Sequence, residues 1–425
     1  MPKFKRYDMK EPPRRFKWYL KPVADLICAP AIRKYRPRVT CRGGIEAMDG
    51  PYLLLCNHNA FLDISVAYSL LRKKHPNFVV AIDGFIGREQ LLRNIGCICK
   101  RKFTTDPGLI RKLKTVLDRG DIPVIYPEAR YSLCGTTAVL PSSLGKMIKL
   151  FRVPVGTLIC HGHHVNSPFW DTSHERGIPY DEAEFSLLLT KEETETLSAD
   201  EINDRILEAF QYDDFAWQRD NSIRITDPSR ADGLDKVLYQ CPACGKEYRM
   251  TSSGAVLSCT ACGKAWTMDE MGQLHADKGE TEFPHIPDWY EWQRENVRRE
   301  VTAGTYSTGV LPVNVKSLPN ARKFIDLGEG ELVHDGNGFR VTLKHPPEDD
   351  TKEIVLKVPE TYSVHIEYRD LFKNGDCVDL NTPDDTWYVY PHDCDFAVTK
   401  MALAAEELYQ EDRRRKGKPC KKGFA

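Results

Sequence analysis

The sequence predicts an α/β fold in which a layered sheet is covered by helices on both faces. Uniformly apolar runs alternate with helical segments between residue 51 and about residue 160. Such runs are typical of strands that are buried on both faces. The runs that predict strands are PYLLLC (51–56), NFVVAID (77–83), GCICK (96–100), IPVIYPE (122–128) and VPVGTLI (153–159).

The segments between these strands have the pattern of helices. In DPGLIRKLKTVLDRG, Asp106 is suited to the N-cap, Pro107 to the first turn and Gly120 to the exit. The apolar side chains of this segment recur on one helical face. We expect a helix here, and further helices within 60–74, 140–151 and 198–210.

The composition is that of a globular chain with basic ends. The 425 residues suffice for roughly three domains of about 150 residues each, and 41% of them are apolar. Residues 1–42 hold thirteen Lys or Arg against three acidic residues, and RRRKGKPCKK near the other end adds seven more basic residues. Fourteen scattered cysteines, and a start without the apolar core of a signal peptide, favour a reducing cytoplasm over a secreted disulfide framework.

The basic N-terminal segment also carries apolar side chains, among them Trp18, Tyr19 and Leu26. Lys and Arg near an anionic lipid surface contribute about 1 kcal/mol each, while apolar side chains enter the interface. No stretch reaches the ~20 apolar residues of a transmembrane helix. We therefore expect residues 1–34 to bind the inner face of an anionic membrane peripherally. A solvated charged face and nonspecific contact with nucleic acid are the alternatives.

His58 and Asp63 follow the first predicted strand, in LLLCNHNAFLDIS (53–65). A neutral imidazole can take a proton from a hydroxyl, and a carboxylate on its other nitrogen fixes the tautomer. Apart from the strand residue Cys56, no Ser or Cys lies beside His58, so the activated alcohol is expected to come from a substrate. The alternative is that His58 satisfies the helix start and that Asp63 lies on the surface.

The segment NHNAFLD resembles the motif of His, any four residues and Asp that marks the glycerolipid (lysophospholipid) acyltransferase family. Three further blocks resemble those of the family and follow in its order: GCICKRK (96–102), YPEARYS (126–132) and VPVGTLI (153–159). The resemblance covers about residues 35–200 and implies the layered sheet of 1-acylglycerol-3-phosphate acyltransferases.

The resemblance also implies roles for single residues. His58 would be the general base that deprotonates an acceptor hydroxyl, and Asp63 would orient it. The hydroxyl would attack the thioester of acyl-CoA or acyl carrier protein, and the acceptor would be a lysophospholipid such as 1-acylglycerol-3-phosphate. In the family the second and third blocks bind the acceptor phosphate, which implies substrate-binding roles for Gly96, Arg101, Lys102, Glu128 and Arg130.

The third block departs from the family pattern. The family has an arginine three residues after the glutamate, where this chain has Tyr131, and Arg130 lies one place early. A different lipid or amino-alcohol acceptor is therefore the alternative within the enzyme class, although the remaining basic residues favour an anionic acceptor. A non-catalytic zinc-ribbon scaffold, or a protein that binds nucleic acid, is the alternative outside that class.

Two Cys-x-x-Cys pairs, Cys241 with Cys244 and Cys259 with Cys262, are separated by fourteen residues. A glycine follows each pair, and four thiolates complete a tetrahedral structural zinc site. The segment resembles a zinc ribbon, and a thioredoxin-like redox pair is the competing interpretation.

Three histidines, His161, His163 and His164, follow the fourth block. Three histidines this close can indicate a metal site, but the lining of the active-site rim or ordinary loop polarity is the favoured interpretation.

Beyond residue 305, short β-type runs are separated by turn sequences such as DGNG and NTPDD, and one helix closes the region. This pattern resembles a pleckstrin-homology-like sandwich, and the domain is a candidate site for a protein partner. The expected organisation is a basic segment at 1–34, an acyltransferase domain at 35–230, a zinc ribbon at 236–275, a linker helix at 280–303, a β-rich domain at 305–410 and a basic tail at 411–425.

Overall fold

The computed structural model describes residues 5–44, 48–345, 352–368, 375–418 and 423–424. Its N-terminal part contains a seven-stranded sheet in which β6 and β7 are antiparallel and all other neighbours are parallel. In spatial order the strands are β1 (Arg38–Arg42), β7 (Glu182–Leu189), β6 (Val155–His161), β2 (Leu53–Cys56), β5 (Ile122–Ile125), β3 (Pro76–Ala81) and β4 (Ile98–Lys100).

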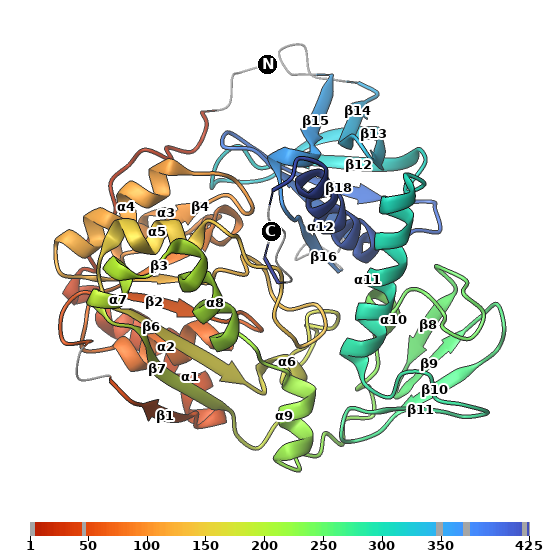
Figure 1. The fold of residues 1–425 in the computed structure, drawn as a ribbon, viewed down its shortest axis with the longest axis horizontal. Helices are drawn as coiled ribbons and strands as arrows, with labels where there is room; N and C mark the ends of the chain where they lie inside the picture. The colour runs from red at the N-terminus through yellow and green to blue at the C-terminus, as the bar shows by residue number, and fades with distance from the viewer. Residues whose placement is uncertain (1–4, 45–47, 346–351, 369–374, 419–422, 425) are drawn as a thin grey trace.

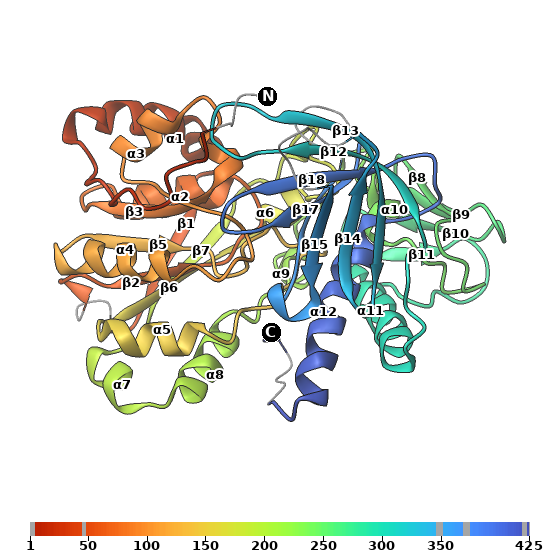
Figure 2. The ribbon, with the colours of Figure 1, turned by 90° about the horizontal axis from the view of Figure 1, so that it is seen from above.

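Helices cover both faces of this sheet (Figures 1 and 2). Alternate residues of β2 show why the strand is apolar throughout, because Leu54 packs in a core shared with α2 whereas Leu53 packs with α4 and α5. The predicted α/β layering is thus confirmed. One face carries α1 (Lys21–Tyr35) and α2 (Leu62–Leu71), and the other carries α4 (Pro107–Asp118), α5 (Leu144–Phe151) and α8 (Ala199–Ala209).

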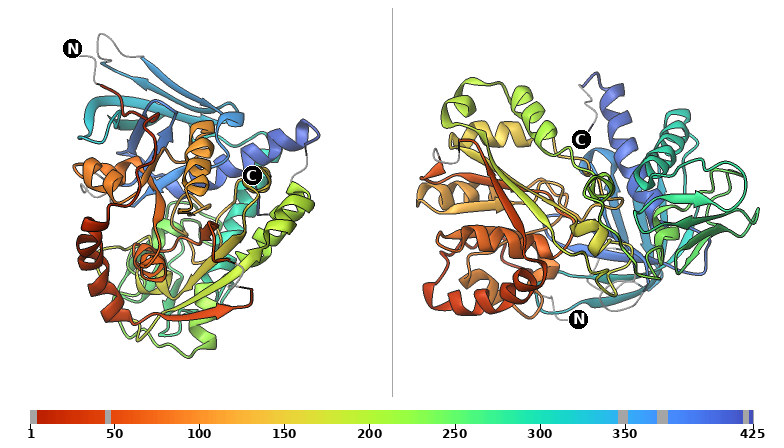
Figure 3. Two further views of the ribbon diagram at one scale, coloured as in Figure 1. Left: turned by 90° about the vertical axis from the view of Figure 1, so that its left-hand side faces the viewer. Right: turned by 90° about the horizontal axis from the view of Figure 1, so that it is seen from below.

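The right-hand view of Figure 3 shows this layering from below, with the red helices and the green helices on opposite sides of the sheet. Further short helices are η1 (Trp18–Leu20), η3 (Ile82–Phe85), α3 (Glu89–Asn94), α6 (His163–Asn166), α7 (Lys191–Thr196), α9 (Asp214–Asp220) and α10 (Leu234–Val237). Within the described ranges, every helix is too short or too polar to cross a bilayer.

A small antiparallel sheet surrounds the paired cysteines. Its strands, in the order β11-β10-β9-β8, are β8 (Met250–Ser253), β9 (Val256–Cys259), β10 (Ala265–Met268) and β11 (Leu274–Ala276). The sheet packs against α11 (Ile286–Ala303), where the Trp266 and Trp289 rings meet edge to face at 4.9 Å. This helix lies within the region expected to be a linker helix, and Pro287 stands in its first turn.

The last region is one antiparallel sheet with the order β15-β14-β13-β12-β18-β17-β16. The long helix α12 (Val398–Arg415) lies beside α11 (Figures 1 and 3). This sheet and α12 are called the β-rich domain below, and the pleckstrin-homology-like resemblance stays a prediction. The strands are β12 (Leu311–Ser317), β13 (Ile325–Asp335), β14 (Gly338–Leu343), β15 (Glu353–Lys357), β16 (His365–Glu367), β17 (Cys377–Asn381) and β18 (Thr386–Pro391), with η4 (Val358–Glu360) after β15.

One edge of the large sheet faces the β-rich domain. The strands β2, β4, β5 and β6 are parallel, so their carboxyl ends lie at the same edge. Arg101 and Arg130 follow β4 and β5, and both contact the β-rich domain. Ligands of open α/β sheets bind at the carboxyl ends of the strands, so a functional site is expected at this edge.

Candidate active site

His58 and Asp63 lie in hydrogen-bond contact at the carboxyl end of β2. The Nδ1 atom of His58 is 3.1 Å from Oδ2 of Asp63. The backbone N–H groups of Asn59 and Ala60 donate to the same oxygen, at 2.6 and 3.0 Å. Asp63 stands in the first turn of α2, where the helix dipole favours a carboxylate. The side chain of His58 is 18% exposed, whereas that of Asp63 is 1% exposed.

A second histidine shares the Asp63 carboxylate. His163 contacts Oδ1 of Asp63 through Nδ1, and its Nε2 is 2.8 Å from Oδ2 of Asp181. Burial lowers the pKa of His163, but its two carboxylate partners outweigh burial and raise the pKa to about 10. Burial likewise raises the pKa of Asp63, and the hydrogen bonds from the two histidines outweigh that and lower it to about 2. Asp63 is thus an ionised carboxylate held between two imidazoles.

Glu128 supports the backbone of His58. Its Oε1 accepts the His58 backbone N–H at 3.0 Å, and its Oε2 accepts the Ala138 N–H at 2.7 Å. The Tyr212 hydroxyl donates to the same carboxyl group at 3.0 Å. Burial raises the pKa of Glu128 to about 8, although the two backbone N–H groups partly oppose that effect. Glu128 therefore fixes the backbone at His58, at the carboxyl end of β2.

Aromatic rings surround the imidazole of His58. The rings of Tyr126 and Tyr131 each lie 4.3 Å from it, centroid to centroid. Tyr131 also contacts Phe169 at 5.7 Å, and Phe169 contacts His365 of the β-rich domain at 5.8 Å. An aromatic path thus joins the candidate base to the β-rich domain, and Tyr131 occupies the position where the family carries arginine.

Arg101 and Lys102 are engaged by the β-rich domain. Lys102 is 2.9 Å from Asp83 and 3.8 Å from Asp379 of β17. Arg101 is buried, and its guanidinium donates to the carbonyl oxygens of Leu318, Pro319 and Asp384 and to Oγ1 of Thr386. A phosphate role for these side chains stays a prediction, and it requires the contacts to open.

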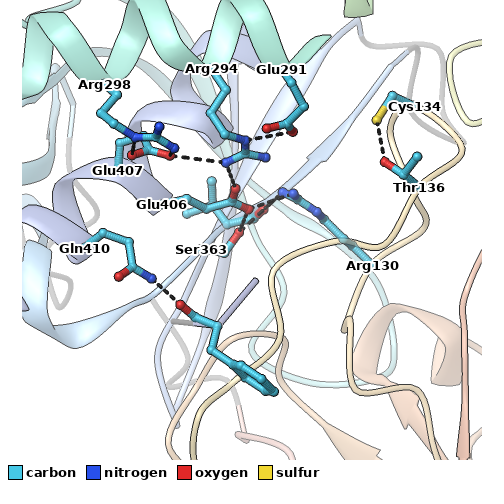
Figure 4. A network of polar contacts seen from close by, with 12 residues as sticks. Arg130, Cys134, Thr136, Glu291, Arg294, Arg298, Ser363, Glu406, Glu407 and Gln410 are labelled. Carbon is cyan, nitrogen blue, oxygen red and sulfur yellow. Dashed lines mark hydrogen bonds and ion pairs between the residues drawn. The ribbon is translucent and has the colours of Figure 1, made fainter. Parts of the chain in front are cut away.

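Arg130 is likewise turned toward the β-rich domain. Its Nη2 is 2.7 Å from Oε1 of Glu406 in α12, and its Nη1 donates to the Val364 carbonyl oxygen at 3.2 Å. Figure 4 shows this guanidinium beside Glu406, which lies at the centre of a network of charged side chains. Gly96 lies in the turn before β4 with φ +87°, where an added Cβ would meet the Asn77 side chain at 2.8 Å. The structure thus brings Glu128 to His58 and Asp63, and it gives the other predicted ligands partners within the protein.

The three neighbouring histidines do not converge on one point. His163 bridges the two aspartates, whereas the His161 ring stacks on Trp217 at 6.3 Å and the His164 ring packs on Trp170 at 5.0 Å. Sequence reasoning placed these residues at the rim and missed the contact of His163 with Asp63. The sequence signal for this contact was that the histidines directly follow a predicted strand, as His58 does, so that they lie at the same edge of a parallel sheet.

The four paired cysteines converge. Their sulfur atoms all lie within 4.8 Å of one another, and the Cys241–Cys262 and Cys244–Cys259 distances between Sγ atoms are 3.8 Å. Four thiolates at about 2.3 Å from a tetrahedral zinc ion lie about 3.8 Å apart. The donor set and its spacing therefore fit zinc.

A known family model matches part of the chain. Residues 34–161 match the family model described as Acyltransferase, and this range includes His58, Asp63 and Glu128. Residues 34–161 form an acyltransferase domain. The chain is therefore an acyltransferase enzyme.

Among solved structures, the chain is similar to the 1-acyl-sn-glycerophosphate (LPA) acyltransferase PlsC from Thermotoga maritima. The identity is 12% and the TM-score is 0.33, over 45% of this chain and 79% of that chain. None of the curated proteins matches the chain.

Proposed function

We propose that this acyltransferase moves a fatty acyl group from acyl-CoA or acyl carrier protein to a hydroxyl of a lysophospholipid such as 1-acylglycerol-3-phosphate. The observation that carries the proposal is the 3.1 Å contact between Nδ1 of His58 and the ionised Asp63. This contact keeps the proton on Nδ1, so that Nε2 is the free base. It lies within the acyltransferase domain, at the sheet edge where substrates of open α/β folds bind.

In the proposed reaction, Nε2 of His58 takes the proton of the acceptor hydroxyl as its oxygen attacks the thioester carbonyl carbon. The C–S bond then breaks, and the imidazolium returns the proton to the leaving thiolate. Asp63 keeps its negative charge throughout and stabilises the imidazolium. The second imidazole, His163, holds Asp63 in place from its other oxygen.

A different lipid or amino-alcohol acceptor is the second candidate. The observation that favours it is that the terminal nitrogens of Arg101 and Arg130 already donate within the protein, to carbonyl oxygens, to hydroxyl groups and, for Arg130, to Glu406. A phosphate would have to displace these partners before it met either guanidinium. Binding of lysophosphatidate through these arginines therefore requires the β-rich domain to move, whereas binding of an amino-alcohol lipid does not.

We also propose that η1 and α1 bind an anionic membrane surface. Trp18 is 81% exposed and Leu26 is 75% exposed, and Tyr19, Val23 and Ile27 are exposed beside them. Exposed apolar groups among basic residues are typical of interfacial helices. Phe61, between His58 and Asp63 in the sequence, is 61% exposed, which places an apolar side chain next to the candidate base.

The four cysteines are proposed to hold a structural zinc ion. Four protein ligands leave no open coordination position, so the ion would stabilise the fold and take no part in the reaction. The ribbon packs on α11, which in turn lies beside α12 of the β-rich domain. The ion would therefore support the linker helix from one side.

The test is an acyl-transfer assay on anionic vesicles with acyl-CoA and, separately, acylated carrier protein. The acceptors are lysophosphatidate, lysophosphatidylethanolamine and an amino-alcohol lipid. Wild-type transfer to one acceptor, with a loss of at least about 10²-fold in His58→Ala, is expected. Transfer that persists unchanged in His58→Ala would eliminate the mechanism, and the accepted lipid decides between the two acceptor proposals.

A further inference from the structure

The turn that holds His58 is itself anchored in the β-rich domain. Residues Glu128, Tyr131 and Ser132 all contact His58: the carboxyl group accepts its N–H, the phenol packs on its ring, and the Ser132 N–H donates to its carbonyl oxygen at 2.9 Å. Arg130 stands in the middle of this turn, yet its side chain points away, toward α12.

The backbone of the turn is strained. Ala129 has a φ of +57°, a left-handed conformation that L-residues other than glycine adopt at a cost in free energy. Such a conformation persists only when surrounding contacts hold it. On one side Glu128 is fixed by Tyr212 and by backbone N–H groups, and on the other side Arg130 is fixed by the β-rich domain.

Glu406 is the principal anchor of Arg130. Its Oε1 is 2.7 Å from Nη2 of Arg130 and accepts the Ser363 hydroxyl at 2.8 Å, while its Oε2 is 2.6 Å from Nη1 of Arg294 in α11 (Figure 4). The side chains of Arg130 and Glu406 are both nearly fully buried. Burial raises the pKa of Glu406, but the two guanidinium groups outweigh burial and hold it below its usual value. The carboxylate is thus ionised and bridges two helices of the C-terminal half to the turn.

We propose that Glu406 is a positioning residue for the acyltransferase: through Arg130 it holds the strained Glu128–Ser132 turn against His58, so that the β-rich domain sets the geometry of the candidate base. The inference rests on the proposed function of His58. It differs from a phosphate-binding role for Arg130, because it assigns that guanidinium to the protein itself. It also gives the β-rich domain a part in turnover without any contact between that domain and the reacting atoms.

The test compares Glu406→Gln with Arg294→Gln in the full-length protein. Both changes disrupt the same buried network, but only the first weakens the anchor of Arg130. In Glu406→Gln we expect kcat to fall about tenfold to a hundredfold with little change in the KM of the acceptor, because a small misplacement of a catalytic group has effects of this size. In Arg294→Gln we expect a lower melting temperature and nearly unchanged kcat.

A second change distinguishes positioning from general stability. Ala129→Gly removes the strain of the left-handed residue, so the turn needs less anchoring. In the Glu406→Gln background it is expected to restore kcat by up to about tenfold. If kcat falls in proportion to stability in both single variants, and Ala129→Gly restores nothing, the role is structural only and the proposal is overturned. A rise in activity in Glu406→Gln also overturns it, since this would mean that the contact blocks substrate.

A readout that does not depend on activity separates this inference from the proposed function. Amide hydrogen exchange of the peptide that covers residues 126–132 is expected to speed up at least about tenfold in Glu406→Gln and to stay unchanged in Arg294→Gln. Unchanged exchange in Glu406→Gln overturns the inference even if the wild type transfers acyl groups. Faster exchange with no transfer by the wild type, on any acceptor, instead removes the proposed function and leaves the anchor in place.

Discussion

His163 contacts one oxygen of Asp63 while His58 contacts the other, at 3.1 Å. The two histidines are far apart in the sequence, and the carboxylate between them is almost fully buried. Asp181 caps the far nitrogen of His163. His58, Asp63, His163 and Asp181 thus form a chain in which imidazoles and carboxylates alternate, and the candidate base is its more exposed end. The inner pair is ionised, so Asp63 presents a negative charge to His58.

This chain predicts a pH dependence of stability. The pKa of His163 is raised from 6.5 to about 10, so its stabilising contribution is fully present below about pH 6.5 and is lost as the pH rises to about 10. The difference in unfolding free energy between wild type and His163→Gln should therefore shrink between pH 6.5 and 10, as measured by urea denaturation. Burial raises the pKa of Glu128 to about 8 in both proteins, so its effect cancels. Burial also raises the pKa of Asp214 to about 7, and the charge of His163 partly opposes this, so the comparison is made in an Asp214→Asn background. A difference that stays constant with pH would contradict the charged state of His163.

Replacing Asp63 tests the orientation of the base. An amide in Asp63→Asn cannot accept hydrogen bonds as the carboxylate does from both histidines, so the tautomer of His58 is no longer fixed. We expect kcat to fall about 10³- to 10⁴-fold, by analogy with the same change in other His–Asp pairs. The matched control is Asp118→Asn at the exposed end of α4, which should leave transfer rates unchanged. Normal turnover in Asp63→Asn would show that His58 needs no partner.

The cysteine cluster predicts a bound metal ion. Elemental analysis of the purified protein should find about one zinc ion per chain, and Cys259→Ser should lose it. Because the ribbon packs on α11, metal removal by a chelator should lower the melting temperature of the whole protein. Cys41→Ser, at an exposed cysteine outside the cluster, is the control. A chain that holds no metal, and melts unchanged with chelator, would exclude the structural zinc.

The exposed apolar residues of η1 and α1 predict membrane binding. The double change Trp18→Ser and Leu26→Ser removes two large side chains that touch little in the protein, so folding should be unaffected while sedimentation with anionic vesicles weakens about tenfold or more. Leu150→Ser is the control, because Leu150 is 57% exposed on α5, on the opposite face of the sheet. Equal loss of vesicle binding in the double variant and in the control would mean that any exposed apolar side chain contributes, and it would contradict a specific membrane surface on η1 and α1.

Binding through this surface should also depend on salt. Attraction of Lys and Arg to anionic lipids is screened at high ionic strength, whereas insertion of Trp18 and Leu26 is not. We expect sedimentation with neutral vesicles to be weak, and binding to anionic vesicles to decline between low and physiological salt. Binding that ignores both lipid charge and salt would argue against the basic residues as contacts.

Local features of the sequence predicted much of this protein. Apolar runs indicate where a strand is buried, and cap and turn residues indicate where a helix or strand begins or ends. The structure has a strand at each predicted apolar run, a helix after the cap residue Asp106 and strands between the turns after residue 305. Asp63 reaches His58 across only four residues, so a single motif contains the whole contact. The paired cysteines repeat the same short pattern, which predicted that the four thiols lie together.

Only the tertiary structure decided which groups surround the base. His163 reaches Asp63, and Asp181 reaches His163, because β6 is parallel to β2 and β7 lies beside β6. No local pattern encodes that pairing. The arginines of the second and third blocks were expected to meet substrate, but their partners come from the β-rich domain, more than two hundred residues later. Charge and spacing determine what a side chain can bind, whereas the packing of distant segments determines which partner is within reach.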